Sequence, residues 1–215
     1  NPYDANIKWE ETTTYNVGLD YGFLKNRITG AIDLYKRETK DLLNFIPIAA
    51  GSNFSNFLTT NVGNLENKGF EFSASYTNDD KPFKYTISAN LGTLKNEVLE
   101  IGANNLPIYG AASKTEVGRS IGEIFAYETA GIFKDAADVA ASPRQVNAAP
   151  GDIKFRDVNA DGIINEDDRT YQGITIPKYS YGLNFSSTYK NWDFSFFWQG
   201  SGGNKVFNGV YRDLM

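Results

Sequence analysis

The stretch "TTYNVGLDYGF", residues 13–23, decides the fold class. Its side chains alternate between two sets. The apolar set is Tyr15, Val17, Leu19, Tyr21 and Phe23, and the polar or small set is Thr14, Asn16, Gly18, Asp20 and Gly22. Because successive side chains of a β-strand point to opposite faces, the stretch predicts a strand with one apolar and one polar face.

The same alternation returns in five further segments, which pair into hairpins. Strands are predicted near residues 12–24, 27–36, 67–77, 83–92, 179–189 and 192–199. Short polar turns join the members of each pair, at Lys25-Asn26, "NDDKP" (78–82) and Lys190-Asn191. The sequence therefore predicts an all-β fold built from three antiparallel hairpins.

The connections between the hairpins are much longer than the turns within them. They cover residues 37–62 and 93–178. Outer-membrane barrels combine tight periplasmic turns with long extracellular loops, and strands of about ten residues suffice to cross the bilayer. Aromatic residues at strand ends, such as Tyr15, Phe23 and Trp192, match the girdles of such barrels. We therefore expect a segment of a large antiparallel transmembrane β-barrel with long extracellular loops.

The alternative is a soluble β-sandwich that acts as a ligand-binding module with a calcium-stabilised loop, because the strands of a sandwich also alternate and its core also contains aromatic residues. In that fold, the aromatic faces of two sheets would pack against each other. The polar set favours the barrel: it consists mainly of Gly, Ser, Thr and Asn with isolated charges such as Asp20, Asp33 and Asp193. A sandwich exterior usually carries more charge, whereas this composition suits a hydrated barrel interior.

The composition excludes several classes of function. The 215 residues include no histidine and no cysteine, which removes the Ser-His-Asp triad, thiol nucleophiles and most transition-metal sites. A net charge of −5 argues against a nucleic-acid partner. The acid pairs Asp79-Asp80 and Asp167-Asp168 are adjacent in sequence, which does not suit a glycosidase dyad. We therefore do not expect an enzyme.

Three motifs, taken in order, carry a family resemblance: "WEETTTYNVGLD" (9–20), "NVGNLENKGFE" (61–71) and "GDIKFRDVNADG" (151–162). Together they resemble the C-terminal barrel portion of SusC/RagA-type TonB-linked outer-membrane transporters of Bacteroidetes. The resemblance implies location in the bacterial outer membrane, contact with its lipid, and uptake of an oligosaccharide or peptide energised through TonB. It also implies a SusD-like surface lipoprotein as a lid.

The resemblance further implies that these residues are a segment of a longer chain. The plug, the TonB-contacting part and the earlier strands of such transporters have no counterpart in the 215 residues. Six strands cannot close a barrel of that size, and unpaired strand edges are costly in lipid.

The stretch "DVNADGIINEDD" (157–168) has the spacing of a calcium-binding loop. The candidate ligands are Asp157, Asn159, Asp161, the carbonyl of Ile163, Asn165 and Asp168, with Gly162 at the sharp turn. The last position is Asp rather than the bidentate Glu of an EF-hand. The alternative is a loop shaped without metal, in which Asp and Asn form Asx turns.

Two other segments of the long connections suggest local features. Residues 134–143, "KDAADVAASP", predict a short helix that ends before the proline. Phe54 and Phe57 are candidates for stacking on a sugar or for contact with a lid protein, with ordinary loop packing as the alternative.

Overall fold

The computed structural model describes residues 4–47, 57–102 and 104–208, which are almost entirely β-strands and turns. The chain divides into two compact units. The first contains residues 1–108, 115–121 and 176–204, and the second contains residues 109–114, 122–175 and 205–215. The all-β class predicted from the alternation is confirmed.

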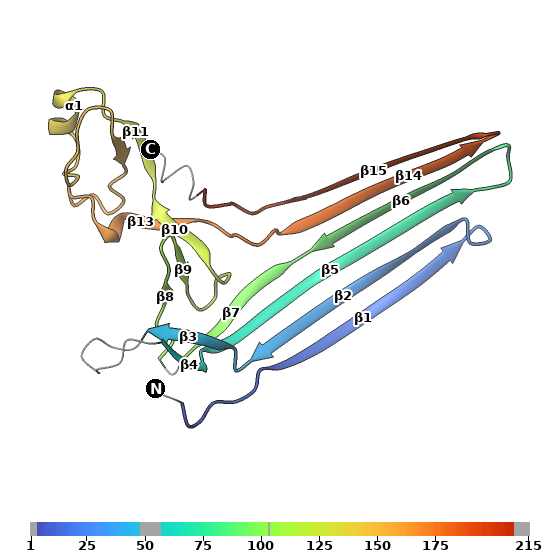
Figure 1. The fold of residues 1–215 in the computed structure, drawn as a ribbon, viewed down its shortest axis with the longest axis horizontal. Helices are drawn as coiled ribbons and strands as arrows, with labels where there is room; N and C mark the ends of the chain where they lie inside the picture. Colours follow the sequence, from blue (N-terminus) through green and yellow to red (C-terminus); the bar gives the residue numbers. More distant parts are fainter. Residues whose placement is uncertain (1–3, 48–56, 103, 209–215) are drawn as a thin grey trace. The chain divides into compact units, whose positions relative to one another are not determined.

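The first unit is built on one seven-stranded antiparallel sheet (Figure 1). Six of its strands lie side by side in the order β1-β2-β5-β6-β14-β15. Their bounds are β1 Glu11–Phe23, β2 Ile28–Lys40, β5 Gly63–Asn78, β6 Phe83–Thr93, β14 Tyr179–Tyr189 and β15 Trp192–Gly202. β7, Lys95–Ile101, pairs with the first part of β5. The six strands of the main order form at the six segments where side chains alternate, because that alternation suits a sheet with two different faces.

Tight turns close the three hairpins at one end of this sheet. Leu24, Lys25 and Asn26 all have positive φ, at 54°, 57° and 63°, and Lys190 has φ of 54°. Neighbouring turns are joined by an ion pair between Arg27 and Asp80. The turn end of the sheet is therefore polar and charged.

The sheet is open. Among the described residues, β1 and β15 are the end strands, and each pairs with a single neighbour, β2 and β14 respectively. Both carry unpaired backbone donors and acceptors along their outer edges, which a closed barrel would pair with further strands.

The two long connections contain more regular structure than the sequence interpretation gave them. In 37–62, β2 continues to Lys40 and is followed by the hairpin of β3, Leu43–Pro47, and β4, Phe57–Asn61. In 93–178, β7 continues the line of β6 along β5. These strands are short or rich in charge, so their alternation is too weak to recognise without a partner strand.

Most residues of a small four-stranded sheet, in the order β13-β10-β9-β8, belong to the second unit. These strands are β8 Ile108–Tyr109, β9 Ser113–Thr115, β10 Glu123–Tyr127 and β13 Arg169–Gly173. A second pair, β11 Thr129–Ile132 and β12 Ile153–Phe155, lies beside the helix α1, Ala136–Ala141 (Figure 1). The core of the second unit contains the buried side chains of Ile124, Phe133 and Ile164.

The helix predicted within residues 134–143 is confirmed as α1. Asp135 caps it by accepting a hydrogen bond from the backbone N–H of Asp138 at 2.8 Å. Among the described residues, no helix is long and apolar enough to cross a membrane.

Candidate functional site: the two faces of the sheet and the acidic loop

One face of the large sheet is an exposed apolar surface. The strand register places apolar side chains directly opposite one another in rows across successive strands. One row runs Leu19, Ile32, Phe72, Leu91, Tyr181, and a second runs Phe23, Ile28, Tyr76, Ile87, Phe185, Phe196.

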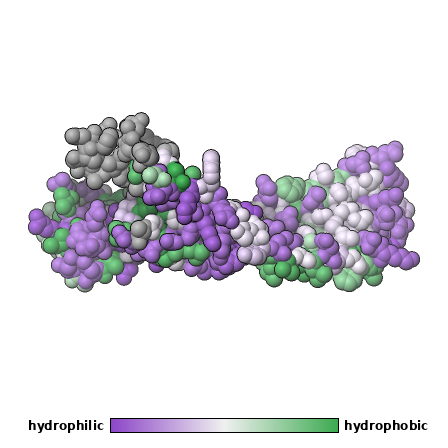
Figure 2. All heavy atoms as spheres, turned by 90° about the horizontal axis from the view of Figure 1, so that it is seen from below, coloured by the Kyte–Doolittle hydropathy of each residue, from purple (hydrophilic) through white to green (hydrophobic). Residues whose placement is uncertain are grey.

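Many side chains of this apolar face are exposed. Val17 is 74% exposed and Trp192 is 79% exposed, and Leu19, Leu34, Phe194 and Trp198 are also exposed. Figure 2 shows hydrophobic residues along one side of this sheet and hydrophilic residues at its turn end. Contiguous apolar surface of this extent is rare on a soluble monomer and marks contact with lipid or protein.

The opposite face is polar and uncharged over most of its area. Its residues are mainly Ser, Thr, Asn and Gly, including Asn16, Gly18, Ser73, Ser75, Ser88, Asn90, Ser180, Asn184 and Ser186. Hydroxyl pairs bridge adjacent strands, at 2.9 Å between Ser75 and Ser88 and 3.2 Å between Thr77 and Thr86. This face offers hydrogen bonds to water or to a polar solute.

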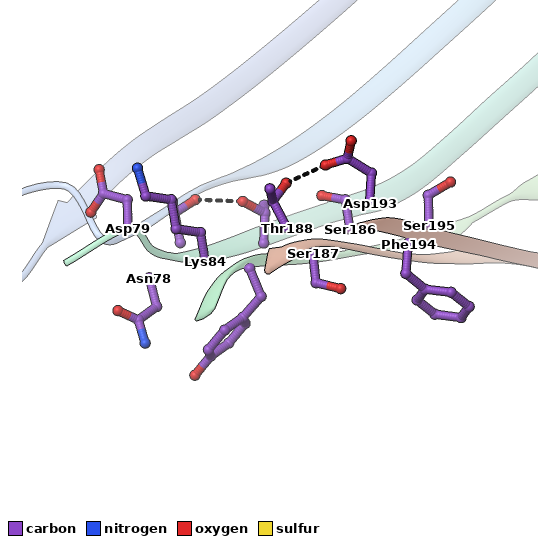
Figure 3. Close-up of a pocket in the computed structure, with 12 residues that line it drawn as sticks. Asn78, Asp79, Lys84, Ser186, Ser187, Thr188, Asp193, Phe194 and Ser195 are labelled. Atoms are coloured by element: carbon purple, nitrogen blue, oxygen red, sulfur yellow. Dashed lines mark hydrogen bonds between the residues drawn. The ribbon is translucent and has the colours of Figure 1, made fainter. Parts of the chain in front are cut away.

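A shallow pocket of about 330 Å³ lies on the sheet near its turn end (Figure 3). Thr188 donates to Asp193 at 2.8 Å, and Lys84, Ser186 and Ser195 lie on the same side. Phe194 and Ser187 point to the other side of the sheet. The residues are suited to hydrogen bonding and ion pairing, and the close-up displays the separation of the two faces.

The predicted calcium loop is ordered by its own side chains. Asp157 accepts hydrogen bonds from the backbone N–H groups of Asp161 and Gly162 at 3.3 and 2.8 Å. Asp161 accepts from the N–H of Ile163 at 2.8 Å. Gly162 has φ of 82°, in the left-handed region that the sharp turn requires. The loop is therefore a series of Asx turns.

Asp168 is the buried anchor of this loop. Its side chain is fully buried and accepts from the N–H of Val158 at 2.8 Å and from the N–H of Asn165 at 2.9 Å. The N–H groups of Asn165 and Val158 hold the pKa of the Asp168 carboxyl below its ordinary value of 3.8. Asp168 thus joins the beginning of the loop to its end.

The six candidate calcium ligands all lie in this one loop, as their spacing requires. Within residues 4–47, 57–102 and 104–208, no three acidic side chains converge as they would around a metal ion. The candidate ligand set also contains two Asn side chains and a carbonyl, so calcium binding stays a prediction. Phe54 lies outside the described residues, as does the side chain of Phe57, and their proposed role stays a prediction too.

Comparison with known proteins agrees with this architecture. A family model described as TonB dependent receptor-like, beta-barrel matches residues 1–213. The chain is 34% identical over 206 residues to the TonB-dependent receptor SusC of Bacteroides thetaiotaomicron, a match covering 95% of this chain and 20% of that protein. It is 32% identical over 217 residues to the TonB-dependent receptor P26 of Formosa agariphila, covering 96% of this chain and 22% of that protein.

A solved structure shows the same fold. The structure of the RagAB peptide transporter matches with a TM-score of 0.73 at 22% sequence identity, over 94% of this chain and 22% of that one. The chain therefore spans about a fifth of the length of the relatives it matches.

Proposed function

The chain belongs to the TonB-dependent receptor β-barrel family of the outer membrane, and we propose that it forms part of the wall of a nutrient importer. The resemblance to SusC/RagA-type members noted in the sequence is confirmed by the SusC match and the RagAB fold. These relatives are receptors and transporters, not enzymes.

The observation that carries this proposal is the contrast between the two faces of one open sheet. The apolar face bears large exposed side chains such as Val17 and Trp192, and burial in lipid would remove the cost of exposing them to water. The other face presents hydroxyl and amide groups, which suit a hydrated interior. The open edges of β1 and β15 would pair with the remaining strands of the barrel.

We propose an oligosaccharide or a peptide as the transported substrate. Both are rich in hydrogen-bonding groups, which match the Ser, Thr and Asn side chains of the polar face. The energy would come through TonB, and a SusD-like lipoprotein would cover the external opening, as the family resemblance implies. A strain that lacks this receptor can be grown with either peptides or oligosaccharides as the sole nutrient. Loss of growth on one nutrient and not on the other identifies the substrate class.

The soluble β-sandwich is not supported by this structure. That alternative requires the aromatic faces of two sheets to be buried against each other. In the described residues, the aromatic face of the large sheet is exposed at Tyr15, Phe23, Phe194 and Trp198.

The placement of the faces is tested with two neighbouring residues of β1. Leu19 is on the apolar face and Asp20 on the polar face. Each is replaced by cysteine in a cysteine-free form of the parent receptor and labelled with an environment-sensitive fluorophore in reconstituted vesicles. We expect a lipid-attached quencher to act on the probe at position 19 and aqueous iodide on the probe at position 20. Equal quenching of both probes by iodide would contradict the proposal.

A further inference from the structure

The apolar face of the sheet ends in two rows of charge. Lys36, Lys68 and Lys95 lie directly opposite one another on β2, β5 and β7. Two residues farther along each strand, away from the tight turns, Glu38, Glu66 and Glu97 form a second row. Both rows lie on the same face as the apolar residues, because each strand advances by two residues between them.

Each lysine of the first row forms an ion pair with at least one glutamate of the second row. Lys36 pairs with Glu38 at 2.7 Å and with Glu66 at 2.9 Å, and Lys68 pairs with Glu66 at 2.6 Å. Lys95 pairs with Glu97 at 2.6 Å. Within each row, however, like charges face each other across the strands, which is unfavourable. The lysine row therefore gains from an additional anion on its other side.

That other side is apolar. The next row toward the turns contains Leu34 and Phe70, with Val17 at its end on β1. A groove of about 430 Å³ runs along this surface, and its lining includes Tyr15, Val17, Leu34 and Phe70, with Lys36 and Lys68. A single surface thus offers a strip for a hydrocarbon chain and two ammonium groups at one end of it.

The charged groups are also layered by exposure. The side chains of Lys36 and Lys68 are 45% and 47% exposed, whereas those of their partners Glu38 and Glu66 are 27% and 8% exposed. Both carboxylates are less exposed than the ammonium groups, which remain accessible from outside. Each ammonium has three donors. Lys36 uses two of them, for Glu38 and Glu66, and Lys68 uses one for Glu66, so each has at least one donor for a further anion.

We propose that this groove binds a phosphorylated lipid, with an acyl chain along Val17, Leu34 and Phe70 and the phosphate across Lys36 and Lys68. The lysine row lies at the end of the strands opposite the tight turns. Tight turns are periplasmic in outer-membrane barrels, so the lipid belongs to the outer leaflet. The proposal depends on the placement of the sheet in the membrane and not on which substrate is transported.

Binding is measured by titrating lipid A into the detergent-solubilised parent receptor. The comparison ligand is the same lipid after enzymatic removal of its phosphates, and inorganic phosphate alone is the third ligand. We expect the intact lipid to bind more tightly than both. Equal binding of the dephosphorylated lipid would show that the surface binds only the acyl chains, and equal binding of free phosphate would show that the acyl chains contribute nothing. Either result would overturn the proposal.

The lysines are tested with a variant that leaves no buried carboxylate unpaired: Lys36→Gln, Glu66→Gln and Lys68→Gln combined. We expect binding of intact lipid A to weaken about 10- to 30-fold, since each lysine near a membrane surface contributes on the order of 1 kcal/mol. Lys36→Arg with Lys68→Arg keeps both charges and is expected to retain binding.

The matched control is Lys25→Gln with Lys81→Gln, which removes two lysines at the turn end of the same sheet. We expect this variant to bind lipid A as the unmodified receptor does. Equal weakening by the control would show a general charge effect, and unchanged binding by the triple variant would show that Lys36 and Lys68 do not hold the phosphate. Either result rejects the site.

Discussion

Tyr21 on β1 lies directly opposite Gly30 on β2, and its hydroxyl donates to the carbonyl of Ser73 on β5 at 2.9 Å. The ring therefore passes over a residue without a side chain and joins three strands. A methyl group at position 30 would collide with the Tyr21 ring and with the Ser73 carbonyl. The same arrangement recurs where Tyr35 faces Gly69.

Gly30→Ala is expected to destabilise the parent receptor by about 1–3 kcal/mol, because the added methyl group would displace the Tyr21 ring and press against the Ser73 carbonyl. The measurement is thermal unfolding in detergent, followed by the mobility of unheated and heated samples on gels. The control is Gly92→Ala, since a Cβ at Gly92 would meet only Ser180 Oγ, at 3.4 Å. If the cost arises from the ring, Gly30→Ala will cost less in a Tyr21→Ala background. An unchanged cost there would rule out the ring as its cause.

Ile87 and Ser88 are neighbours on β6 that face opposite sides of the sheet. Ile87→Lys places a charge on the apolar face and is expected to cost about 2–4 kcal/mol in the membrane, whereas Ser88→Lys places it on the polar face at little cost. Folding yield into lipid vesicles over a urea series provides the comparison. A larger loss for Ser88→Lys than for Ile87→Lys would invert the assignment of the faces.

The sequence was sufficient for the parts of the fold that depend on alternation over ten or more residues. The strands β1, β2, β5, β6, β14 and β15 lie within a few residues of the segments that alternate. β7 was missed because its sequence, "KNEVLEI", is charged on the face that continues the apolar surface. Its identity as a strand becomes clear only from its pairing with β5.

The features that depend on register could not be read from the sequence. Lys36, Lys68 and Lys95 are separated by about 30 residues along the chain, and only the pairing of three strands brings them into one row. The pairing of Tyr21 with Gly30 has the same origin. Asp168 differs again: the calcium-like spacing marks it as a ligand, but its burial depends on the packing of the second unit.

Calcium would add to the order of the 157–168 loop rather than create it. The side chains of Asp157, Asn159, Asp161 and Asn165 already accept hydrogen bonds from the backbone of the loop. Removal of Ca²⁺ from the parent receptor with EGTA is therefore expected to leave amide hydrogen exchange in this loop within about threefold of its starting rate. A much larger increase on chelation, reversed by added Ca²⁺ but not by Mg²⁺, would make calcium a structural component of the loop.

The buried carboxylate of Asp168 makes this loop sensitive to acid. Its pKa in the folded protein lies below the ordinary value of 3.8, because the N–H groups of Asn165 and Val158 favour the ionised form. A group with a lowered folded pKa stabilises the protein fully above its unfolded pKa, and this stabilisation is lost as pH falls through the folded value. Exchange protection of residues 158–165, corrected for the intrinsic rate, is therefore expected to be constant from pH 7 to about 5 and to decrease at pH values below about 3.8.

Asp168→Asn removes this dependence and lowers protection at pH 7, because a neutral amide has one acceptor oxygen for the two N–H groups. Asp167→Asn is the control, since Asp167 is an exposed neighbour outside this pair of hydrogen bonds. An acid transition that persists in Asp168→Asn would assign it to another carboxyl.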